Sequence, residues 1–132
     1  MKTDNSRVVK LPMRAVHMFG ATTGTVLLAT ATHVILYDLA QRQEVASCQA
    51  ANVKYVTWSA DMQSLTLLGK HTILIVNKAL EQQCIIHETI RIKSGIWTRD
   101  GIFMYSTLNH IKYALANGFI LPFFFRWLLL FS

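Results

Sequence analysis

The sequence predicts an all-β fold, an incomplete β-propeller with about two full blades plus parts of two others. Three observations predict it. A pattern recurs with a period near 39 residues, the runs inside each period are short and rich in β-branched and aromatic residues, and polar turns separate the runs. Because one small sheet cannot cover both of its apolar faces, repeats of this length stack face to face around an axis.

The repeat is clearest around two tryptophans. The segment 58–62 (Trp-Ser-Ala-Asp-Met) returns as 97–101 (Trp-Thr-Arg-Asp-Gly), 39 residues later. A histidine that opens a β-rich run recurs as His33, His71 and His110, at separations of 38 and 39 residues. The Trp-Asp dipeptide that names the common WD-type repeat is absent, so we expect degenerate WD-type blades.

Strands are expected wherever such runs lie between turns. Residues 8–11 form a possible strand that stops at Pro12. In the first blade, two β-rich runs are followed by a run of mixed polarity that suits an exposed outer strand. These predicted strands are residues 25–29, 33–38 and 44–48.

The second blade shows the same order more clearly. A partly alternating run with aromatic residues precedes two almost wholly apolar runs, which predict inner strands covered on both faces. The third blade repeats this outline, and Gly101 suits its first turn because glycine tolerates positive φ. The predicted strands are residues 53–58, 65–68, 73–76, 82–87, 90–97, 102–106 and 110–114.

Three regions of the chain differ in composition. Residues 1–7 are polar and lack periodicity, which predicts a disordered arm, and residues 8–118 hold the partial propeller blades. Residues 119–132 are almost continuously apolar, so we expect a divergent tail that does not complete a blade and that resembles a truncation or gene-model artefact. Pro122 and Arg126 interrupt this run, which is too short to span a membrane and lacks the charged face of an interfacial helix.

The net charge of +6 permits acidic partners such as nucleic acid or an anionic membrane. The cations are spread singly along the chain, so we expect solvated surface charge and no nucleic-acid site. The two cysteines, Cys48 and Cys84, cannot build a disulfide framework and favour a reduced cytosolic compartment. They occupy different positions in the repeat, which predicts buried apolar filler.

Two sets of residues have the amino-acid types of a metal site or a catalytic triad. His33, His71 and His110 could suggest a metal, but blade spacing holds equivalent positions apart while zinc needs its nitrogens at about 2.0–2.1 Å. We expect them to bond to local backbone instead. Ser59, Asp61 and His71 supply the letters of a catalytic triad, yet no Gly-x-Ser-x-Gly elbow surrounds the serine.

Glycines and tryptophans are better explained by structure. Gly95 and Gly101 do not build a phosphate loop. Trp58 and Trp97 could serve a peptide-binding surface, but their place at the end of a first strand favours core packing. We therefore assign no catalytic, cofactor-binding or metal-binding residue and expect neither an enzyme nor a cofactor.

Several short segments of the sequence, taken in order, resemble a known protein family. Residues 58–62, 70–71, 87–95 and 109–113 are similar, in the same order, to the α subunits of coatomer, the COPI vesicle coat. They fall in the second WD-type propeller, the coatomer WD-associated region, and the resemblance covers residues 7–118.

The resemblance implies a structural, non-enzymatic role in Golgi-to-ER and intra-Golgi vesicle transport. It implies protein–protein contacts with the other coatomer subunits, a cytoplasmic location, and peripheral association with Golgi and vesicle membranes through the coat. No nucleic acid and no small-molecule substrate is implied. The family's dilysine cargo-tail site lies on the first propeller, so no cargo-binding residue carries over to this chain.

Two other hypotheses stay open. The chain could belong to an independent adaptor propeller that recognises a peptide, for instance in ubiquitin or RNA-processing assemblies. An α-solenoid encoded downstream and another propeller upstream would favour the coat instead. Alternatively, the polypeptide has no function of its own, and its unclosed sheets and apolar end make it aggregate when expressed alone.

Overall fold

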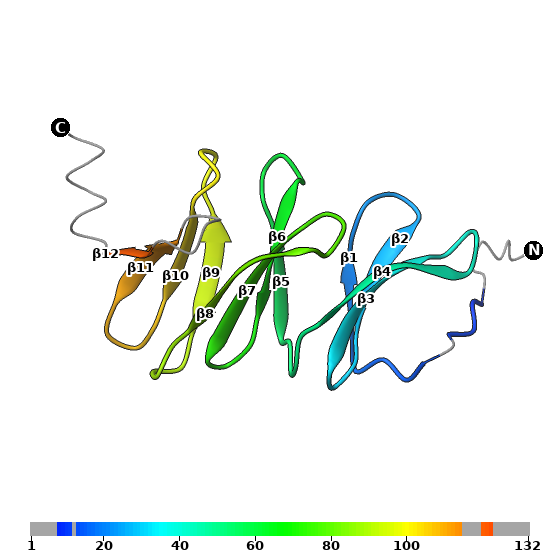
Figure 1. Ribbon diagram of the computed structural model, residues 1–132, viewed down its shortest axis with the longest axis horizontal. Coiled ribbons are helices and arrows are strands. Elements are labelled where there is room, and N and C mark those ends of the chain that lie inside the picture. Colours follow the sequence, from blue (N-terminus) through cyan, green and yellow to red (C-terminus); the bar gives the residue numbers. More distant parts are fainter. Residues whose placement is uncertain (1–7, 12, 115–119, 123–132) are drawn as a thin grey trace, which may run out of the picture.

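A computed structural model of the chain describes residues 8–11, 13–114 and 120–122. These residues form three four-stranded antiparallel sheets that stand in a row with their faces toward one another (Figure 1). Each sheet is an up-and-down meander, because strands adjacent in sequence are hydrogen-bonded neighbours. Within the described ranges, no helix has the length and apolar character needed to cross a membrane.

The first sheet contains β1 (His17–Gly20), β2 (Thr25–Ala29), β3 (His33–Asp38) and β4 (Gln43–Gln49). The predictions for β2 and β3 are confirmed to the residue, and β4 extends the predicted run by one residue at each end. The possible strand at residues 8–11 is wrong, because β1 takes the place beside β2. β1 was missed because it is short, contains no β-branched residue, and is held by its pairing with β2.

The second sheet contains β5 (Tyr55–Trp58), β6 (Ser64–Leu68), β7 (Thr72–Asn77) and β8 (Gln82–His87). The apolar residues of β6 and β7 are all buried, which confirms the prediction of inner strands covered on both faces. The β7–β8 pairing shifts register between Ile75 and Val76, and the β3–β4 pairing shifts at the equivalent pair, Leu36 and Tyr37. The repeat therefore extends to local irregularities of the backbone.

The third sheet contains β9 (Ser94–Trp97), β10 (Phe103–Ser106), β11 (Ile111–Ala114) and β12 (Ile120–Pro122). β12 lies in the apolar run that was predicted not to complete a blade, and that prediction is wrong for these three residues, which pair with β11 as the fourth strand. Backbone groups make this pairing, so it does not require the alternating side chains that usually indicate a strand. The predicted arm, residues 1–7, and the rest of the apolar tail lie outside the described residues.

Two apolar cores lie between the three sheets. The first joins the facing sides of the first and second sheets, and the second joins the second and third sheets. The largest fully buried side chains are Tyr105 and Phe103, which lie in the second core. Two connecting residues, Val53 and Ile92, precede β5 and β9 and are buried in the first and second core respectively. Each sheet thus depends on its neighbour for burial, as stacked blades do.

Short polar residues end two equivalent strands. The Asp38 carboxylate accepts hydrogen bonds from the N–H groups of Ala40 and Gln41 at 2.9 and 3.0 Å. The Asn77 side-chain oxygen accepts in the same way from residues 79 and 81, both at 2.9 Å. These side chains are the last residues of β3 and β7, and they fix the turn that follows each strand. Gly101 has φ +82°, which confirms the prediction for its turn.

Candidate functional site

The two repeated tryptophans hold neighbouring blades together. The Trp58 indole N–H donates to the carbonyl of Gly20 at 3.1 Å, and the Trp97 indole N–H donates to the carbonyl of Thr57 at 3.0 Å. Both bonds run from the end of a sheet's first strand to the first strand of the preceding sheet. Both rings also pack against the apolar cores between sheets. The prediction that both tryptophans pack in the core is confirmed. The sequence did not reveal that each also makes a hydrogen bond to the preceding blade.

The three repeated histidines are not fully equivalent. His33 and His110 close hairpins, since their carbonyls accept from the N–H groups of Thr30 and Thr107, whereas Thr72 takes this role in the second sheet. His71 therefore lies one position earlier, in the turn itself. Its Nδ1 lies 3.2 Å from the backbone oxygen of Glu88, and His33 Nδ1 lies 2.8 Å from the Thr32 hydroxyl. Among the described residues, no group of three or more His, Cys, Asp or Glu side chains is arranged to hold a metal ion.

The structure does not assemble Ser59, Asp61 and His71 into a catalytic triad, because His71 lies apart from the other two. Ser59 donates its hydroxyl hydrogen to the Asp61 carboxylate at 2.7 Å and accepts from the N–H of Ser64 at 3.1 Å. The bond from Ser59, followed by one from the N–H of Gln63, lowers the pKa of Asp61. His71 lies at the opposite end of β6, so it cannot act on this serine. The pair stabilises the β5–β6 turn.

A buried carboxylate joins the second and third sheets. The Glu88 side chain is 8% exposed and accepts from Lys112 Nζ at 2.6 and 2.9 Å. The Tyr105 hydroxyl also donates to it, at 3.3 Å. Burial, and then the charge of Glu88, raise the pKa of Tyr105. Sequence reasoning missed this cluster, because Glu88 lies 17 and 24 residues from its two partners.

The cysteines behave as filler in outer strands. Cys84 is buried in β8, Cys48 is half-buried in β4, and neither forms a disulfide. Each packs with a different apolar core. Burial raises the pKa of both thiols, which keeps them protonated and unreactive near neutral pH.

Charge is divided between the two ends of the sheets. The end where the odd-numbered strands begin, at the bottom of Figure 1, is named the lower end, and the other the upper end. Except for Glu88, the described carboxylates lie at or next to the upper-end turns: Asp38, Glu44, Asp61, Glu81 and Asp100. Arg42, Lys78 and Arg99 share these turns with them. The lower end carries Lys54, Lys70, Arg91, Lys93 and Lys112.

Four of these lower-end cations surround one hollow. Lys54, Lys70, Arg91 and Lys93 line a cavity of about 260 Å³ between the second and third sheets, together with Tyr55, Leu68, Gly69, Ile92 and Ser94. We name it the basic hollow. No carboxylate lines it, and within the described part of the chain none of the four cations forms an ion pair. The sequence predicted cations that do not cluster, and this prediction is wrong because the lower-end turns and connections bring together residues up to 39 positions apart.

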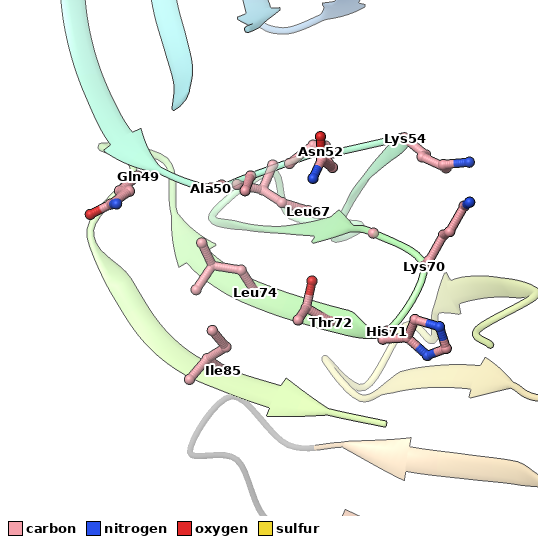
Figure 2. Close-up of a pocket in the computed structure, with 13 residues that line it drawn as sticks. Gln49, Ala50, Asn52, Lys54, Leu67, Lys70, His71, Thr72, Leu74 and Ile85 are labelled. Carbon is pink, nitrogen blue, oxygen red and sulfur yellow. The ribbon is translucent and has the colours of Figure 1, made fainter. Parts of the chain in front are cut away.

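A second hollow adjoins the basic one. It has a volume of about 660 Å³ and lies over the side of the second sheet that faces the first (Figure 2). Its apolar lining includes the exposed Ile85 on β8, and the largely buried Leu67 on β6 and Leu74 on β7 lie beneath it, so we name it the apolar hollow. Lys54 and Lys70 line both hollows, and in Figure 2 both side chains lie at the same edge of the apolar one.

The stacked four-stranded meanders, tied by interblade tryptophans, define the chain as consecutive blades of a WD-type β-propeller. The WD40 domain of Toxoplasma gondii coronin has the same fold, with a TM-score of 0.64 at 15% identity over 85% of this chain and 33% of that chain. The chain belongs to the COPA/B second beta-propeller family, whose model matches residues 1–122. The matched range extends beyond residues 7–118, which the resemblance covers, to the last residue of β12.

Curated relatives confirm the resemblance to coatomer α subunits. Coatomer subunit alpha-1 of Arabidopsis thaliana is 48% identical over 121 residues, which cover 89% of this chain and 10% of that protein. The putative coatomer subunit alpha of Schizosaccharomyces pombe is 49% identical over 113 residues, which cover 86% and 9% respectively. The chain therefore spans about a tenth of the length of these relatives.

Proposed function

We propose that this chain is a structural, non-enzymatic segment of a coatomer α subunit in the COPI vesicle coat. In this role it works through protein–protein contacts with the other coatomer subunits, in Golgi-to-ER and intra-Golgi transport. It is cytoplasmic and joins Golgi and vesicle membranes peripherally, through the coat. The observation that carries the proposal is the match to the second-propeller family over residues 1–122, with near 50% identity to coatomer α subunits.

The exposed face of the third sheet supports a segment that continues into further blades. Ile96 and Ile111 on this face are 62% and 44% exposed. The residues at the Ile111 register position in the other sheets are Val34 and Ile73, and both are fully buried against the following sheet. Met104, Ile102 and Tyr113 form a small apolar cluster on the same side. Such a face suits packing against another sheet.

A chimera tests the proposed coat role. Residues 8–118 replace the matching segment of the Schizosaccharomyces pombe protein, and the tagged chimera is purified from cells that lack the original copy. We expect the other coatomer subunits to co-purify and the cells to grow. As a control, an equally long run of blades from the coronin WD40 domain should not restore assembly, because fold alone does not supply the contacts.

The outcome separates the coat from the adaptor. A chimera that is folded and abundant, but that no longer brings down the other subunits, would refute the coat role and favour an independent adaptor. The coding sequence on either side of the chain offers a second observation, since a downstream α-solenoid and an upstream propeller are expected only for the coat.

A further inference from the structure

We propose that the two adjoining hollows at the lower end bind a peptide segment of a partner protein in which acidic and apolar side chains lie close together. The acidic side chains would occupy the basic hollow and an apolar side chain the apolar hollow. This inference does not depend on the coat role, because it rests on the surface of the blades themselves.

Charge complementarity is the first argument. Lys54, Lys70, Arg91 and Lys93 line the basic hollow, and three of them are exposed while Lys54 is half-buried. The nearest carboxylate along the chain is that of Glu88, which is already held by Lys112 and by the Tyr105 hydroxyl. The four cations therefore lack a counter-charge within the described residues. An arginine and three lysines give the donors that bind carboxylates, and the guanidinium can do so with two parallel bonds.

The neighbouring apolar hollow decides which kind of anion fits. A free phosphate group would fill only the basic hollow, which is small. A nucleic-acid strand would need a longer basic groove with several aromatic side chains on which bases could stack. Among the residues that line the basic hollow, Tyr55 is the one aromatic residue. A flat membrane would contact protruding groups and would leave the apolar hollow beside Ile85, which is 46% exposed, unfilled. A peptide can place a carboxylate and an apolar side chain on either side of Lys54 and Lys70, which line both hollows.

Peptide binding to the full chain tests this proposal. The chain is tethered at low density so that copies do not touch, and a fluorescent synthetic peptide of glutamate pairs and leucines is titrated over it. We expect saturable binding that nearly disappears at about 1 M salt, where the screening length falls to about 3 Å. Peptides with glutamine for glutamate, or with serine for leucine, should bind at least about tenfold more weakly.

Variants locate the site on the chain. Lys54→Glu with Lys70→Glu should weaken binding about tenfold or more, whereas Lys78→Glu, an exposed cation at the upper end, should have little effect. Ile85→Gln tests the apolar hollow, and Val45→Gln is its control, because Val45 is an exposed outer-strand residue that does not line either hollow. Tryptophan fluorescence of each variant checks that the blades are still folded. If the charge-reversal variant unfolds, the neutral variant Lys54→Gln with Lys70→Gln replaces it in the binding measurement.

Three results would overturn the proposal. The first is equal binding by the folded double-lysine variant and the unaltered chain. The second is equal binding of the glutamate and glutamine peptides. The third is lysine-dependent capture of phosphatidylserine vesicles or of a single-stranded oligonucleotide in the absence of peptide binding, which would make the lower end a membrane or nucleic-acid surface instead.

Discussion

Replacing Gly95 by alanine should destabilise the contact between the second and third sheets. Gly95 lies in β9, and a Cβ atom at this position would stand 2.2 Å from Phe103 Cζ. Carbon atoms pack at about 3.5–4.0 Å, so the ring would have to move by more than an ångström. Phe103 is fully buried, with its ring centroid 5.4 Å from that of Trp97 and 6.2 Å from that of Tyr105, so its neighbours must move with it.

Overpacking of this kind costs about 1–3 kcal/mol. We expect Gly95→Ala in the upper half of that range, because both neighbours of the ring are themselves packed in the second core. With a urea dependence of about 1–3 kcal/mol per molar, the unfolding midpoint should fall by about 1 M. The midpoint is measured by tryptophan fluorescence during urea titration of highly diluted chain, so that association does not contribute.

Gly20→Ala is the matched control, since Gly20 is also a strand glycine and its added Cβ would meet nothing within 4 Å. It should leave the midpoint unchanged or raise it slightly, because alanine restricts the unfolded chain. Adding Phe103→Leu to Gly95→Ala should cost less than the sum of the two single changes. If Gly95→Ala and Gly20→Ala have the same midpoint, the close packing of Gly95 against Phe103 is not a determinant of stability.

Three further predictions concern the same interfaces. Trp97→Phe removes the indole donor to the Thr57 carbonyl and should cost about 1–3 kcal/mol in urea unfolding, and an unchanged midpoint would show that the bond contributes nothing. Burial and the charge of Glu88 raise the pKa of Tyr105 above its ordinary value of 10.0, so the unfolded chain loses that proton at lower pH. Stability should therefore fall as the pH rises above about 10, and less steeply in Tyr105→Phe; equal slopes would contradict this. Ile96→Lys should reduce self-association of the purified chain in size-exclusion chromatography, because Ile96 is 62% exposed on the outer face of the third sheet. A wild-type chain that already elutes as a monomer would refute that prediction.

The repeat in the sequence was sufficient to predict the blades and most of their strands. Buried strands such as 65–68 and 73–76 are recognisable because apolar side chains on both faces leave a continuous run of letters. β1 and β12 could not be recognised in this way. Each is a first or last strand whose position depends on backbone pairing with one neighbour, and pairing leaves no pattern in the side chains.

The candidate site was much less accessible to sequence reasoning. Lys54, Lys70, Arg91 and Lys93 are spaced along the chain like ordinary surface cations, and only the turns of two sheets bring them around one hollow. The sequence analysis rejected a catalytic triad of Ser59, Asp61 and His71, and the structure places His71 at the opposite end of β6 from the bonded pair of Ser59 and Asp61. Which residues lie close together across antiparallel strands depends on where each turn falls, and the residue types alone do not show this.

What the sequence by itself determined is the repeating unit. A period near 39 residues, a tryptophan at the end of each first strand of the second and third sheets, and apolar inner strands follow from the need to bury both faces of a small sheet. What only the tertiary structure decided is how the units meet: the tryptophan bonds to the preceding sheet, the closeness of Gly95 to Phe103, the Glu88 cluster, and the division of charge between the two ends. These features depend on distances between residues that are far apart in the chain, and such distances are set only when the sheets stack.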